Sequence, residues 1–210
     1  MNEIVDWFIT TVSSVDPSLR ALIAALGMFC ETSFLVGLVV PGDTIVFIAA
    51  TGVTNLSEYF WLAGAVLMGS LAGETFGFFL GRTLGRRIRD SRLGKRFIGD
   101  TWLVAEAYLA RRGVLAVFVS RFLPVLHSVV PLVCGMSAMR YWVFIRWTAL
   151  ACFVWTFLYV TIGFLLAEQF QIFATTFKGA GWVFIGGVVI FIVAMHFAKK
   201  RLSRKELGEK

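Results

Sequence analysis

Residues 113–139 read GVLAVFVSRFLPVLHSVVPLVCGMSAM, and this stretch decides how the chain is arranged. It is long enough to cross a bilayer, since a spanning helix needs about 20 mostly apolar residues. Four residues interrupt it: Arg121, Pro124, His127 and Pro131. Because a proline lacks the backbone N–H and clashes with the preceding turn, an uninterrupted helix is disfavoured here.

Basic residues flank this stretch on both sides, with Arg111 and Arg112 before it and Arg140 and Arg146 after it. Loops rich in Lys and Arg stay in the cytoplasm, so a crossing helix would place one basic end on the wrong side. A re-entrant hairpin enters the membrane and returns to the same side. We therefore predict a re-entrant hairpin at 113–139, open to the cytoplasm.

Residues 21–53 give the opposite case. They are too long for one span and barely long enough for two, with Glu31 inside and Pro-Gly-Asp at 41–43. Neither residues 1–19 nor the connection 54–58 contains Lys or Arg. We predict a second re-entrant hairpin here, open to the outer side.

Three further stretches, 59–81, 141–166 and 179–198, are predicted to be ordinary spans. The order hairpin, span, hairpin, span is a repeat inverted about the membrane plane, an arrangement that transporters use to bring broken-helix tips to the midplane. The sequence therefore predicts an all-α membrane protein built on this inverted repeat, with an additional C-terminal span.

The predicted organisation follows from these elements. It comprises an interfacial amphipathic helix (1–18), a membrane domain (19–166) with a basic cytoplasmic segment (82–112), a C-terminal transmembrane segment (167–198) and a basic cytoplasmic tail (199–210). The first twenty residues carry three acids before their only base, so we expect no cleavable signal peptide.

Composition supports a membrane protein. Hydrophobic residues make up 58% of the chain and charged residues 16%, against about 25% charged residues in soluble domains. The net charge of +7 does not indicate nucleic acid, because the bases gather at 82–96 and 199–210, directly after apolar stretches. That placement is typical of cytoplasmic ends near anionic lipid.

Acidic residues at membrane depth are costly and usually functional. Glu31 and Asp43 are such residues in the first hairpin, and either could take up and release a proton during transport. The structural alternatives make Asp43 a turn or capping residue and Glu31 a partner of Arg121. Glu74, in the span 59–81, could serve either a proton path or a bond between helices.

Two cationic candidates lie in the second hairpin. The planar guanidinium of Arg121 suits a phosphate or a carboxylate, and the acids of the first hairpin are its expected resting partners. His127 can titrate near physiological pH and bind phosphate as a cation, although an isolated histidine is more often a core residue.

The tips of the hairpins and the small residues complete the set. We expect Pro41 and Gly42 in one tip, and Pro124, Pro131 and Gly135 in the other, as turn or hinge residues. Glycines recur every four residues from Gly69 to Gly81, a pattern that lets helices approach closely. The three cysteines lack paired spacing, so we predict no metal and no cofactor.

These motifs, in this order, resemble the DedA family, also called SNARE-associated or VTT-domain membrane proteins. The matching segments are Glu31 with PGDT (41–44), GRTLG (81–85), SRFLP (120–124) and VPLVCGMSAM (130–139). The resemblance covers about residues 27–166, most of the chain.

The resemblance implies two oppositely oriented re-entrant hairpins and transport of lipid. Bacterial members are linked to recycling undecaprenyl phosphate or flipping phosphatidylethanolamine, often dependent on the proton-motive force, and eukaryotic relatives scramble phospholipids. Glu31, Asp43 and Arg121 fall on the family's functional acidic and arginine positions. His127 departs from the family, which commonly has a second arginine there.

We therefore expect a flippase or scramblase for a phosphate-bearing lipid, linked to protons, in a bacterial cytoplasmic membrane. Its expected partners are membrane lipids, protons and a second copy in a homodimer, and no nucleic acid. The alternatives are a proton-coupled carrier of a small ion and a non-transporting scaffold of the envelope or division machinery. An enzyme is not expected, because the sequence contains no recognisable catalytic motif.

Overall fold

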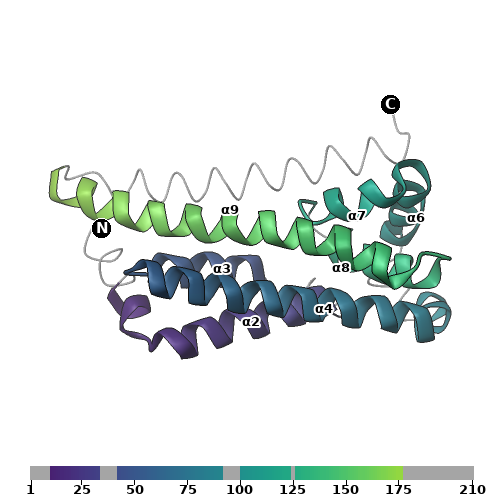
Figure 1. The fold of residues 1–210 in the computed structure, drawn as a ribbon, viewed down its shortest axis with the longest axis horizontal. Coiled ribbons are helices and arrows are strands. Elements are labelled where there is room, and N and C mark those ends of the chain that lie inside the picture. The colour runs from purple at the N-terminus through teal and green to yellow at the C-terminus, as the bar shows by residue number, and fades with distance from the viewer. Residues whose placement is uncertain (1–9, 34–41, 92–99, 124–125, 177–210) are drawn as a thin grey trace.

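The computed structural model of the chain describes residues 10–33, 42–91, 100–123 and 126–176. Every regular element in these ranges is a helix (Figure 1), as the sequence predicts. Of the predicted interfacial helix (1–18), the structure describes only residues 10–18. Pro41, Pro124, the predicted span 179–198 and the tail 199–210 lie outside the described residues.

Two long helices dominate the described part of the fold, α4 (Leu56–Asp90) and α9 (Tyr141–Thr176). They pack against each other and run in opposite directions (Figure 1). Residues 56–85 and 141–166 of these helices are long and apolar enough to cross a membrane, and they contain the predicted spans 59–81 and 141–166.

Both long helices continue past the predicted ends of the spans. The end of α4 runs into the basic segment as far as Asp90, and α9 goes on to Thr176. The sequence prediction stopped where the apolar residues stop. Arginine, glutamate and glutamine are good helix formers, so the helices do not need to end at the edge of the apolar stretch.

Each stretch predicted to be a hairpin contains two short helices that pack on each other. The first pair is α2 (Pro17–Ser33) and α3 (Gly42–Thr51), and the second pair is α7 (Val114–Ser120) and α8 (Leu126–Met136). α3, α7 and α8, with 10, 7 and 11 residues, are too short to cross a bilayer alone, and α2, with 17 residues, is at the lower limit. Entry and return on one side of a membrane stay a prediction for both pairs.

The packing of these pairs follows a two-unit pattern. The first helix of each pair contacts the long helix that follows it in the chain, α2 on α4 and α7 on α9. The second helix contacts the long helix of the other half, α3 on α9 and α8 on α4. This exchange and the opposite directions of α4 and α9 are compatible with an inverted repeat, which stays a prediction.

A further helix, α6 (Asp100–Arg112), packs against α7 and α8 from the basic segment. The chain turns from α6 into α7 at Gly113, whose φ of 56° is a backbone conformation that residues with a Cβ rarely adopt. Parts of the predicted basic segment 82–112 are thus helical, in α4 and in α6.

Buried apolar side chains form two clusters, one towards each end of the long helices. The first cluster includes Met28, Val46, Leu62 and Trp155. The second cluster includes Phe78, Val130, Leu132 and Phe144. Along α4, Ser70 and Glu74 lie between the two clusters and are themselves buried. A polar layer therefore separates two apolar ones.

The glycines of α4 bring its neighbours close, as their spacing predicts. A Cβ added at Gly69 would collide with the backbone of Ala25 in α2, and one added at Gly81 would collide with the backbone of Leu132 in α8. The two hairpin pairs therefore lie against α4 at backbone distance, which fixes their depth relative to each other.

Large apolar side chains cover the outer surfaces of the helices. Exposed examples are Leu22 and Leu26 on α2, Trp61, Met68 and Phe79 on α4, and Trp142, Phe153 and Leu158 on α9. Water would not favour so much exposed apolar area, whereas lipid tails would.

Candidate functional site

Glu31 lies near the end of α2 and joins the two helices of the first pair. Its Oε2 accepts a hydrogen bond of 2.7 Å from the backbone N–H of Asp43, in the first turn of α3. A Cβ at Gly42 would collide with this carboxylate, so the glycine lets the acid reach the helix end. Glu31 thus satisfies one of the N–H groups that open a helix.

Asp43 stands in the same first turn, where the helix dipole favours a negative charge. Its Oδ1 is shielded from the surface and has no hydrogen-bond partner among the described residues. Glu31 makes a capping bond to this helix end, because its side chain accepts from the backbone N–H of Asp43. A turn or capping role for the side chain of Asp43 stays a prediction.

Arg121 ends α7 and contacts three groups from other helices. Its Nη1 lies 3.5 Å from Oε1 of Glu74, and its Nη2 donates to Oγ of Ser70 at 3.4 Å. Its guanidinium carbon lies 4.4 Å from the centre of the Trp155 ring, an approach typical of a cation on an aromatic face. The Nε has no partner among the described residues.

This arrangement corrects one sequence expectation. Arg121 does not contact the acids of the first hairpin: its carboxylate partner is Glu74, on α4. Glu31 and Asp43 act on Arg121 only electrostatically, at longer range. Arg121 directly follows α7, which packs on α8 and α9, and from there its side chain reaches Glu74 on α4.

His127 takes the position beside Glu31. Its Nε2 lies 3.3 Å from Oε1 of Glu31, within ion-pair distance but outside hydrogen-bond geometry. The neighbouring Ser128 donates its hydroxyl to the backbone carbonyl of Glu31 at 3.1 Å. The start of α8 therefore meets the end of α2, and the two hairpin pairs touch at the polar layer.

The predicted hinge residues Pro131 and Gly135 lie elsewhere. Both are inside α8, which begins at Leu126, so they are not at a tip. Gly135 lies against the backbone of Phe78 and Arg82, so it serves close packing of α8 on α4. Pro131 has no backbone N–H, so the carbonyl of His127, four residues earlier, does not receive its usual helical hydrogen bond. This carbonyl lies in the turn of α8 that carries His127, beside the charges.

The predicted ionisable residues thus meet in one layer from four helices and the turn after α7. Glu31, Glu74, Arg121 and His127 are each 4–5% exposed. Sequence reasoning found all of the charged members but missed Ser70, Ser128 and Trp155. Ser70 stands four residues before Glu74, on the same helix face, and that spacing could have indicated it.

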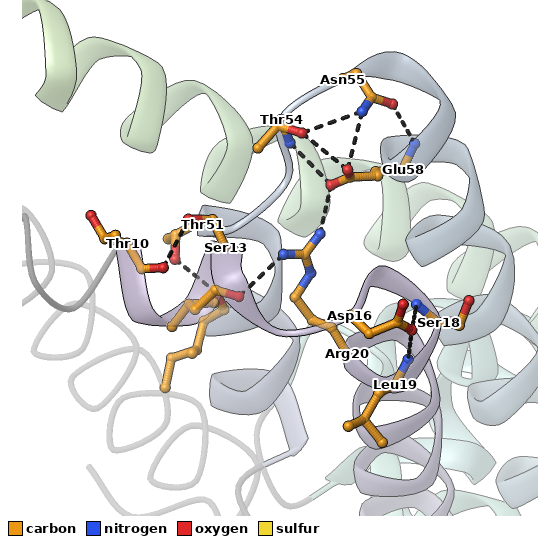
Figure 2. A network of polar contacts seen from close by, with 12 residues as sticks. Thr10, Ser13, Asp16, Ser18, Leu19, Arg20, Thr51, Thr54, Asn55 and Glu58 are labelled. Atoms are coloured by element: carbon orange, nitrogen blue, oxygen red, sulfur yellow. Dashed lines mark hydrogen bonds and ion pairs between the residues drawn. The ribbon is translucent and has the colours of Figure 1, made fainter.

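A partly buried ion pair was also missed, at the end of the molecule where α4 begins (Figure 2). Arg20 of α2 donates to Oε2 of Glu58 at 2.6 Å and to the carbonyl of Val12 at 3.2 Å. Glu58 also accepts from Thr54 and Asn55, in the turn between α3 and α4. This pair ties three segments together, and it neutralises the base nearest the predicted outer side.

At the other end, a groove of about 750 Å³ opens between α6, α7, α8 and α9. Apolar side chains line most of it, including Leu109, Val133 and Met136, and its charged lining residues are Arg140 and Glu106. Its mixed lining suits an amphiphile whose charged end remains near Arg140.

Comparison with known proteins identifies the family. The model of the VTT domain matches residues 40–165, more than half of the chain. The chain therefore belongs to the VTT-domain family of DedA membrane proteins, as the motifs indicate. Asp43, Glu74, Arg121 and His127 lie inside the matched region, and Glu31 precedes it.

Relatives of this chain come from several bacteria. It is 23% identical over 175 residues to Protein DedA of Escherichia coli (strain K12), covering 77% of this chain and 80% of that protein. It is 35% identical over 140 residues to the uncharacterized membrane protein YkoX of Bacillus subtilis (strain 168), covering 61% and 62%. No solved structure matches.

A third relative, the alkaline phosphatase-like protein of Lactococcus lactis subsp. cremoris, is 28% identical over 149 residues, covering 67% of this chain and 70% of that protein. Its name describes that protein. In the part of this chain that the structure describes, no group of three His, Cys, Asp or Glu side chains could hold a metal ion.

Proposed function

We propose that this membrane protein moves the phosphate-bearing head group of a lipid across the bilayer, coupled to protons. One observation carries the proposal: acids, an arginine and a histidine from both halves of the fold meet in a buried layer between two apolar clusters. Charges at such depth are costly and are retained for transport or coupling.

The contacts of Arg121 suit a site that exchanges partners. Its bonds to Glu74 and Ser70, at 3.5 and 3.4 Å, are at the long end of hydrogen-bond distances. A phosphate offers several charged oxygens to the planar guanidinium and would bind it with two parallel bonds. The head group would then take the place of Glu74 on Arg121.

The balance of charge supports a role for protons. Glu31, Asp43 and Glu74 supply three carboxyl groups, against one permanent cation and one histidine. A buried layer with uncompensated negative charge is unfavourable, so binding and release of protons would accompany each change of partner. The pair of Glu31 and His127, at 3.3 Å, is the proposed place of that exchange.

The lipid tail needs no polar path. The outer faces of α4 and α9 are apolar, and the groove at Arg140 is open and largely apolar. A head group could enter the protein there while its acyl or prenyl chain stays in the bilayer. Undecaprenyl phosphate and phosphatidylethanolamine both have this form.

We also propose the orientation that the charges favour, with the basic segment 82–96 and the C-terminus in the cytoplasm of a bacterium. Both hairpin pairs would be re-entrant, with 113–139 entering from the cytoplasmic side and 21–53 from outside. The Arg20–Glu58 pair supports this orientation, since the base nearest the outer side is neutralised.

Reconstitution into liposomes tests the function. Purified protein should move at least one of three labelled lipids, namely undecaprenyl phosphate, zwitterionic phosphatidylethanolamine or a further anionic phospholipid, and should do so faster under a pH gradient. Glu31→Gln should abolish the movement, whereas Thr44→Ala, an exposed neighbour of Asp43, should leave it unchanged. Uptake of an isotopic small ion without any lipid movement would favour the carrier alternative instead.

A further inference from the structure

Two buried hydroxyl groups on α9 have no hydrogen-bond partner among the described residues. In the described part of the chain, the buried side-chain atoms without a hydrogen bond belong to Asp43, Arg121 and His127 of the charged layer, and to Thr148 and Thr156 of α9. Those two threonines are 2% and 0% exposed. Neither threonine has a role in the proposed exchange of head group and proton.

Several other threonines and serines bond to their own helices, and others, such as Ser128, bond to a neighbouring helix. Thr32, Thr51 and Thr83 donate to carbonyls three or four residues earlier, and Ser120 and Ser137 do the same. That local bond is the usual way to satisfy such a hydroxyl in a helix. Thr148 and Thr156 do not make it, so their hydroxyls are available to a ligand.

The position of these hydroxyls connects them to the charged layer. Cys152 lies four residues from each threonine, so the three share one face of α9. Cys152 interacts electrostatically with Arg121 and Glu74, and Trp155 on the same side stacks under the guanidinium. The face Thr148–Cys152–Thr156 therefore runs past the site, over about 12 Å of helix.

Water is the ligand that this face fits. Buried water molecules settle where several otherwise unsatisfied polar groups can bond them. Hydroxyl groups both donate and accept, so they can stand in a chain of water molecules that passes a proton. The unpartnered Nε of Arg121 and Oδ1 of Asp43 offer a donor and an acceptor in the adjoining layer.

We propose that the face Thr148–Cys152–Thr156 of α9 binds a row of water molecules that leads along the helix to the buried charges and carries protons to them. Only the proton-carrying role rests on the proposed function; the hydration of this face does not. The lipid head group and the proton would then reach the layer by different routes.

Hydroxyl-radical footprinting in lipid nanodiscs tests the hydration, because radicals formed from bound water oxidise the side chains beside it. The chain has a control: Cys134 is 0% exposed like Cys152 and also interacts electrostatically with Glu74, but it lies on α8, in an apolar cluster and away from the threonine face of α9. Cys152 should be oxidised at least an order of magnitude faster than Cys134. Thr148→Val and Thr156→Val should each slow it several-fold, and Thr→Ser at either position should restore it.

Equal protection of Cys152 and Cys134, or oxidation that is unchanged in both valine variants, would overturn the proposal. Valine keeps the shape of threonine, so the variants should fold, and unchanged oxidation of exposed Trp142 checks this. In liposomes, Thr148→Val should slow proton-coupled lipid movement and Thr148→Ser should not. Rapid, threonine-dependent oxidation in a protein that moves no lipid would contradict only the proposed function.

Discussion

The carboxylate of Glu31 has two roles that substitutions can separate: it accepts a backbone hydrogen bond, and it carries a negative charge. Its Oε2 holds the N–H of Asp43, and its Oε1 faces His127. Glu31→Gln keeps an acceptor for the N–H but removes the charge, so we expect a loss of stability of only about 1 kcal/mol and loss of transport. Glu31→Ala should cost about 1–2 kcal/mol more, as removal of a cap does.

Thermal unfolding in detergent, beside transport in liposomes, separates these roles. The exposed neighbour variant Thr44→Ala is the reference for both measurements. Full transport by Glu31→Gln would contradict the role of charge. Equal stability of the Gln and Ala variants would contradict the role in the backbone.

Arg121 and Glu74 allow a second separation. Arg121→Ala leaves a carboxyl buried without its cation, which should destabilise the fold by about 3–5 kcal/mol. Adding Glu74→Gln removes the stranded charge and should recover much of that stability. Transport should stay absent in the double variant, because the group that binds phosphate is missing.

The readouts are the midpoint of thermal unfolding and the rate of lipid movement for the two single variants and the double. Recovery of transport in Arg121→Ala/Glu74→Gln would show that the arginine serves only as a structural partner. Failure to recover stability would show that Glu74 is not its principal partner.

At the scale of the helix, the sequence could predict interruptions but not rotations. Proline, charge and apolar length placed the broken stretches and the two long spans, because these signals are local. Which acid meets Arg121 depends on how α4, α7 and α9 are rotated relative to one another, and no local signal contains those angles. For the same reason Arg20 and Glu58, 38 residues apart, were not paired in advance.

The helix interfaces of α4 give a prediction with a built-in control. Gly69→Ala places a Cβ against the backbone of Ala25, which cannot move away without separating α2 from α4. We expect a loss of about 1–3 kcal/mol, as for other overpacked sites. A Cβ at Gly64 meets nothing within 4 Å, so Gly64→Ala should gain up to about 1 kcal/mol from helix propensity.

Thermal unfolding of the two variants measures this difference directly, since both make the same substitution in the same helix. Equal effects at the two positions would contradict the close approach of α2 and α4. Gly81→Ala, which meets the backbone of Leu132, should behave like Gly69→Ala and tests the contact with α8 independently.

For the whole molecule, the question is how the two halves sit in a membrane. Figure 1 places the end of α6 and the start of α9 at one end of the fold, and the start of α4 at the other. In the proposed orientation, which rests on the flanking charges, the first end faces the cytoplasm. Single cysteines at 112 and 140, in a background without the three native ones, should both react from the cytoplasmic side.

A cysteine in place of the exposed Ser57 should react only from the opposite side. Membrane-impermeant maleimide on intact cells and on inverted vesicles distinguishes the sides. If 112 and 140 react from different sides, residues between them cross the bilayer, the second pair is not re-entrant, and Arg121 and His127 lie on a through-going segment. Reaction of both from one side, with Ser57→Cys on the other, would place the charged layer between two short hairpins, where a head group has the least hydrocarbon to cross.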